Sequence, residues 1–94
     1  MAKGKRDAKK TVNYLVGELI GECLAQMGAF SDLEKENQIK EVIIAGVALR
    51  NDMIGKINAY KKSDKAKTYF SDLNKELLER VDAQFDKLFE IVKA

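Results

Sequence analysis

The stretch Val42-Ile43-Ile44-Ala45-Gly46-Val47-Ala48-Leu49 contains no polar side chain and lies within a long run of helix-forming sequence. A helix on the surface of a small domain needs an apolar stripe on one side only. A helix that is apolar on every side needs neighbours on every side, and a chain of 94 residues has few to offer. The stretch therefore predicts a helix that packs within its own chain and also against a partner, most simply a second copy.

Three amphipathic helices are predicted from the spacing of the apolar residues. The helix that contains the stretch is expected over residues 33–60, with its apolar stripe at Ile39, Val42, Ile43, Gly46, Leu49, Met53, Ile54 and Ile57. Before it, residues 7–27 carry apolar side chains at spacings that alternate between three and one, a pattern that excludes a strand. After it, the residues from a second turn to about Val92 repeat the helical pattern with a wider stripe, which Leu78, Phe85 and Phe89 extend.

Two turns separate these helices. Gly28 is expected to end the first helix, and Ser31 or Asp32 to cap the second, with Glu34 completing a capping box on Ser31. The second turn is expected at 61–64, although Ser71 offers a later start for the third helix. We therefore expect an all-α fold: a three-helix antiparallel bundle whose two long C-terminal helices form a hairpin, dimerised through the first and second helices.

The chain is expected to form a single helical domain over residues 7–94, preceded by a disordered basic arm over residues 1–6. The expected location is the cytoplasm, without membrane association, because no apolar run approaches the roughly 20 residues of a membrane span and no secretion signal is recognised. Cys23, the only cysteine, is expected to be a small buried apolar side chain.

Catalysis and metal binding are not expected. The chain has no histidine, which is the commonest general base and the commonest transition-metal ligand. One cysteine cannot form a thiolate zinc cluster, and no phosphate-binding loop is present. We expect no enzymatic activity, no metal and no cofactor.

Small residues form a second pattern. Gly17, Gly21, Ala25 and Gly28 recur on one side of the first helix, roughly opposite its apolar stripe, and Ala45 and Ala48 begin a similar row on the second helix. Glycine within a helix costs about 1 kcal/mol relative to alanine, so these glycines suggest close approach of another helix. The approach is predicted either within one chain or between two. The predicted interface consists of Gly17, Gly21, Ala25, Ile44, Ala45 and Ala48.

Arg50 falls within the apolar stripe of the second helix. One interpretation is that its stem packs while its guanidinium reaches water. Another is a buried ion pair with Glu18 or Glu22 that fixes the register of the helices. A third is an anion-binding role.

Basic residues gather in two places, and they define the alternative function, a nucleic-acid-binding accessory protein. The N-terminal arm and the second turn supply Lys3, Lys5, Arg6, Lys9, Lys10, Lys61, Lys62, Lys65 and Lys67, with Tyr60 and Tyr69 nearby. The overall pI of about 8.6 is lower than that of a typical nucleic-acid-binding domain. The primary prediction is therefore a non-catalytic interaction or assembly module that acts as a homodimer.

Overall fold

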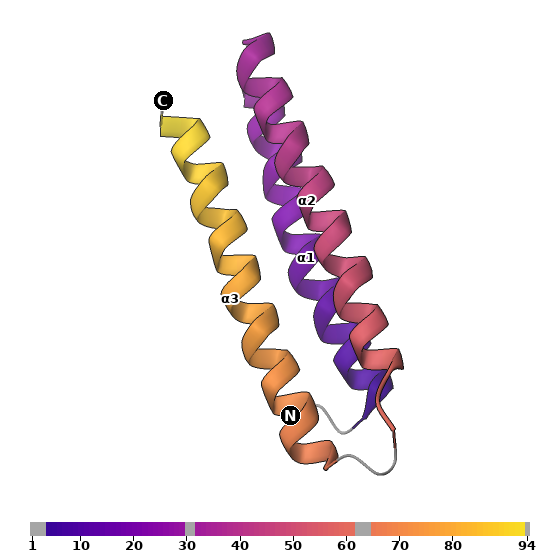
Figure 1. Cartoon of the computed structure of the whole chain (residues 1–94). Coiled ribbons are helices and arrows are strands. Elements are labelled where there is room, and N and C mark those ends of the chain that lie inside the picture. The colour runs from indigo at the N-terminus through magenta and orange to yellow at the C-terminus, as the bar shows by residue number, and fades with distance from the viewer. Residues whose placement is uncertain (1–3, 30–31, 62–64, 94) are drawn as a thin grey trace.

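The computed structural model describes residues 4–29, 32–61 and 65–93, which form three packed helices. These are α1 (Lys5–Ala29), α2 (Leu33–Asn58) and α3 (Ala66–Lys93). Consecutive helices run antiparallel, so α1 and α3 point in the same direction (Figure 1). The bundle is narrow, with extents of 51 × 17 × 16 Å. The all-helical prediction is confirmed, but α1, with 25 residues, is nearly as long as α2, with 26, so the long helices are not only the last two.

The boundary between α1 and α2 confirms one predicted cap. Asp32 has an extended backbone, and its Oδ1 accepts a hydrogen bond of 2.9 Å from the backbone N–H of Glu34. The alternative cap, Ser31, lies outside the described residues. Gly28 does not end α1, because the helix continues to Ala29 and no described glycine has a positive φ.

The N-terminal boundary corrects the predicted arm. Helix α1 begins at Lys5, so Lys5 and Arg6 are helical and do not belong to a disordered segment. Lysine and arginine are good helix formers, and nothing between Gly4 and Asp7 interrupts the helix. Residues 1–3, which include Lys3, lie outside the described part of the chain, as do residues 62–64 in the second turn.

The core follows the predicted stripes and extends along the whole bundle. One cluster of buried side chains joins all three helices and consists of Ala8, Val12, Val16, Leu49, Met53, Ile57, Phe70, Leu77 and Val81. The second cluster lies further towards the other end and consists of Leu19, Cys23, Ile39, Val42 and Leu88. Cys23 is fully buried, as predicted, and burial raises the pKa of its thiol.

The glycine that meets a neighbour within the chain is Gly46. A Cβ on Gly46 would lie 3.3 Å from Cδ2 of Leu19, whereas a Cβ on Gly17, Gly21 or Gly28 would meet nothing within 4 Å. Close packing of the α1 glycine row within one chain is therefore wrong. The contact between α1 and α2 uses the apolar stripe of each helix, and the glycine row faces away from it. Packing of that row between chains stays a prediction.

Candidate functional site

The apolar stretch of α2 is covered on only one side. Val42, Gly46 and Leu49 are buried, whereas Ile44 is 67% exposed, Val47 is 43% exposed and Ala48 is also exposed. The inner half of the stretch packs on α1 and α3, but no described residue covers the outer half. The described residues therefore cover this helix on one side only, and its burial against a partner stays a prediction.

Helix α1 contributes a second uncovered strip beside this one. Leu24 is 58% exposed, and Gly17 and Gly21 are exposed with no neighbour within 4 Å of a Cβ position. Residues three, four and seven apart share one side of a helix. Asn13 therefore shares its side of α1 with Gly17, four residues later, and with Leu24, eleven residues later.

A hydrogen bond fixes how the two strips adjoin. Arg50 Nε donates to Asn13 Oδ1 over 2.7 Å, across the seam between α1 and α2. Val47 lies almost one turn before Arg50 on α2, and Gly17 lies about one turn after Asn13 on α1. Because the two helices are antiparallel, Val47 and Gly17 flank the same part of the seam. We call the set Gly17, Gly21, Leu24, Ile44 and Val47 the outer surface.

The outer surface lies away from α3. The polar contacts from α2 to α3 come from Asp52 and Lys56, whose side chains leave α2 on the other edge. Ala45 shares that edge, seven residues before Asp52, and is half-buried. The other residues of the predicted interface, Gly17, Gly21, Ala25, Ile44 and Ala48, are all exposed, and the interface itself stays a prediction.

The predicted buried ion pair of Arg50 with Glu18 or Glu22 is wrong. Arg50 is exposed, and its guanidinium donates to Asn13 and to Asn51 Oδ1, the latter over 3.2 Å. Glu18 is exposed, and Glu22 accepts a hydrogen bond of 2.9 Å from Gln26. A charged head that stays near water avoids the cost of desolvation, which agrees with the alternative interpretation of Arg50.

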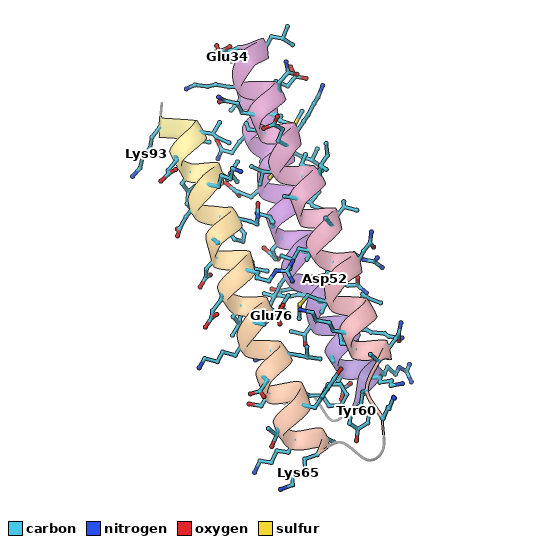
Figure 2. The ribbon with its side chains drawn as sticks, in the orientation of Figure 1. Glu34, Asp52, Tyr60, Lys65, Glu76 and Lys93 are labelled. Atoms are coloured by element: carbon cyan, nitrogen blue, oxygen red, sulfur yellow. The ribbon has the colours of Figure 1, made fainter. Side chains whose placement is uncertain are left out.

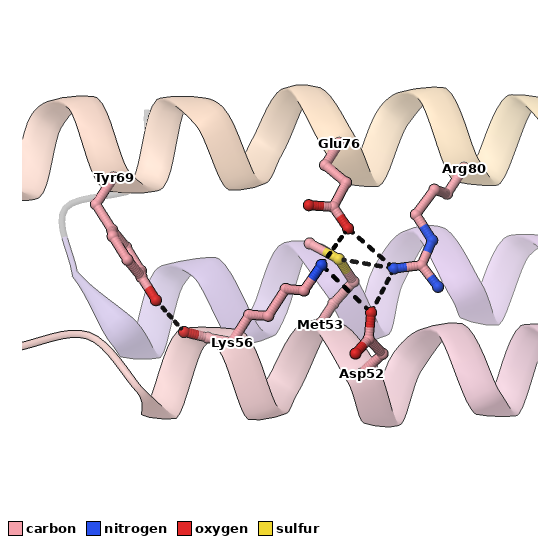
Figure 3. Close-up of polar contacts among 6 residues, drawn as sticks. All are labelled: Asp52, Met53, Lys56, Tyr69, Glu76 and Arg80. Atoms are coloured by element: carbon pink, nitrogen blue, oxygen red, sulfur yellow. Dashed lines mark hydrogen bonds and ion pairs between the residues drawn. The ribbon is translucent and has the colours of Figure 1, made fainter.

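The ion pairs that do join helices lie between α2 and α3 (Figure 3). Lys56 Nζ lies 2.6 Å from Glu76 Oε2, and Arg80 Nη1 lies 2.5 Å from Asp52 Oδ2 and 3.0 Å from Glu76. A hydrogen bond from Arg80 lowers the pKa of Asp52, and a hydrogen bond from Lys56 lowers the pKa of Glu76. All four side chains are partly exposed, so the network orients the hairpin more than it stabilises it.

Aromatic side chains close the end of the bundle next to the second turn. The rings of Tyr60, Tyr69 and Phe70 lie with centroids 4.9 to 5.6 Å apart. The Tyr69 hydroxyl also donates to the carbonyl oxygen of Lys56 over 2.6 Å (Figure 3). The two tyrosines that lie near the lysines in the sequence therefore pack on one another and on Phe70.

The predicted basic residues gather at this same end. Lys5, Arg6, Lys9 and Lys10 start α1, Lys61 follows α2, and Lys65 and Lys67 start α3. Lys5 Nζ donates to the carbonyl oxygen of Asn58 over 3.3 Å, which ties the start of α1 to the end of α2. Lys3 and Lys62 lie outside the described residues.

Within residues 4–29, 32–61 and 65–93, no group of three or more histidine, cysteine or acidic side chains is placed to hold a metal ion. No described helix combines the length and the apolar composition that crossing a membrane requires. Comparisons with protein-family models, with curated proteins and with solved structures find no match to this chain.

Proposed function

We propose that this chain is a non-catalytic assembly module that acts as a homodimer through the outer surface. The observation that carries the proposal is the exposure of Ile44, Val47 and Leu24 beside glycines at which a Cβ would meet no described residue within 4 Å. Exposed apolar side chains that lie together are typical of interaction surfaces. The buried thiol of Cys23 and the lack of histidine are in keeping with a structural role.

The glycines favour a helix as the occupant. Each of Gly17 and Gly21 costs about 1 kcal/mol of helix stability relative to alanine, and no contact within the chain offsets that cost. Without a Cβ, this side of α1 allows the backbone of another helix to come close. Leu24 and Val47 at the margins would then be buried against that helix.

A second copy is the simplest occupant. Dimers with two-fold symmetry use one surface of each copy against the same surface of the other, so a strip of glycines beside apolar side chains can serve both partners. A chain of 94 residues also buries a modest share of its surface, and association adds to that share.

Charge favours an antiparallel arrangement of the two copies. Gly17 is the middle residue of α1, so a two-fold axis near Gly17 would place the start of one α1 beside the end of the other. Arg6 and Lys10 would then face the uncharged residues Leu24 and Gly28 of the second copy. A parallel arrangement would place the basic starts of both copies side by side, and like charges repel.

The test uses two apolar residues of matched exposure. Val47, on the outer surface, is 43% exposed, and Leu78, on α3, is 45% exposed. Val47→Glu is expected to raise the dimer dissociation constant at least tenfold, measured by size-exclusion chromatography with light scattering. Leu78→Glu is expected to leave it unchanged. The proposed surface would be contradicted if the two changes raised the dissociation constant equally, or if Val47→Glu left it unchanged.

A further inference from the structure

The basic residues of this chain are brought together only by the fold. The start of α1, the end of α2 and the start of α3 lie at one end of the bundle, because consecutive helices are antiparallel (Figure 1). Figure 2 shows Tyr60 and Lys65 at that end and Glu34 and Lys93 at the other. We call the set Lys5, Arg6, Lys9, Lys10, Lys61, Lys65 and Lys67 the basic end.

Charge is separated along the long axis of the bundle. Among described residues, the acidic side chains near the basic end are Asp7 and Asp72. At the opposite end the acidic side chains outnumber the basic ones, with Asp32, Glu34, Glu36, Glu41, Asp86 and Glu90 against Lys35, Lys40, Lys87 and Lys93. The net charge of +2 therefore conceals a strongly positive end on a body 51 Å long. A local concentration of positive charge attracts polyanions even when the whole chain is nearly neutral.

Within the described residues, several cations of the basic end, among them Arg6, Lys9 and Lys67, have no ion pair and remain available for an anion. Lys56, slightly further along α2, is already paired with Glu76 and Asp52. By contrast, no ion pair within the described residues joins Arg6, Lys10 or Lys67 to a carboxylate.

The surroundings of these cations favour one class of polyanion. An anionic membrane would be held by apolar side chains as well as by charge. The large apolar side chains that are exposed in the structure, such as Tyr14, Leu24 and Leu78, lie along the body of the bundle and not at the basic end. A purely ionic surface suits the phosphate backbone of a nucleic acid.

We propose that the basic end binds the phosphate backbone of nucleic acid without reading its sequence. Base recognition is not part of the proposal, because Tyr60, Tyr69 and Phe70 pack against one another. Cations at the start of α1 and at the start of α3 would each approach a phosphate, and binding would release counterions. Arg6 and Lys10 also border the proposed dimer contact, so the test below changes only cations of the basic end that lie outside it.

The experiment measures the fluorescence anisotropy of a labelled DNA duplex of mixed sequence, with two charge-reversed variants. The first carries Lys9→Glu, Lys65→Glu and Lys67→Glu at the basic end. The second carries Lys40→Glu, Lys87→Glu and Lys93→Glu at the opposite end, so the change in net charge is the same. Circular dichroism checks that both variants remain helical.

The expected result is binding by the unmodified chain that weakens with salt. If about four phosphates are neutralised, affinity falls about a hundredfold between about 50 and 200 mM salt. The basic-end variant is expected to lose at least tenfold more affinity than the opposite-end variant. No binding at low salt, or equal losses in both variants, would overturn the proposal. Binding to vesicles of anionic lipid without binding to the duplex would also overturn it.

Discussion

Gly46 of α2 lies against Leu19 of α1, where a Cβ would come within 3.3 Å of the leucine Cδ2. Leu19 is fully buried between the helices and has little room to move aside. A side chain at residue 46 would therefore press on Leu19 at this level of the bundle.

A larger side chain at residue 46 is expected to destabilise the bundle. Gly46→Leu would force α1 and α2 apart at Leu19, with a cost of about 1–3 kcal/mol in the free energy of unfolding. Urea denaturation followed by circular dichroism measures this difference. A variant as stable as the unmodified chain would show that the contact is not tight.

The glycines of α1 are expected to behave in the opposite way. Gly21→Ala places a methyl group where no atom lies within 4 Å, so the gain in helix propensity should raise the free energy of unfolding by about 0.5–1 kcal/mol. The measurement is made at low protein concentration, where association does not contribute. Destabilisation under those conditions would mean that a part of the chain packs on this glycine.

The ion network predicts a loss of stability in acid. The pKa values of Asp52 and Glu76 are lowered in the folded chain, so their contribution is present above the pKa values of the unfolded chain. That contribution to the free energy of unfolding is lost as the pH falls below about 4, through the pKa values that the two carboxyl groups have in the folded chain. Between neutral and acidic pH, the melting temperature of the double variant Asp52→Asn, Glu76→Gln should therefore fall less than that of the unmodified chain. Asp82→Asn, outside the network, is the control and should follow the unmodified chain.

Cross-linking tests the proposed antiparallel arrangement. Arg6→Cys and Gly28→Cys place thiols at exposed positions near the two ends of α1, while the native Cys23 is buried. With a short thiol cross-linker, a mixture of the two variants should form covalent dimers more readily than either variant by itself. Efficient cross-linking within each single variant would indicate a parallel dimer instead.

The sequence predicts the helices well because their apolar residues recur at helical spacing. Val12, Val16 and Leu19 are buried on α1, and Ile39 and Val42 on α2, as their periodicity indicates. The antiparallel order of the helices also implies that the two basic segments share one end. Boundaries are less certain: α1 starts before Asp7, because lysine and arginine continue a helix readily.

Contacts between helices are harder to predict from a single sequence. Glycines spaced along α1 indicate that one side is small, but they do not indicate whether another helix lies there. The pairing of Arg80 with Asp52, and of Arg50 with Asn13, depends on how far the helices slide past one another. One signal was present in the sequence, since Asp52 with Lys56 and Glu76 with Arg80 each form an oppositely charged pair four residues apart.

The central claim is that a second copy of this chain covers the outer surface. Sedimentation equilibrium of the unmodified chain, over concentrations from below to well above micromolar, tests it most directly. The account predicts a transition from the 10.6 kDa chain to a species of twice that mass, with the dimer dominant at high concentration. A single 10.6 kDa species throughout that range would contradict it.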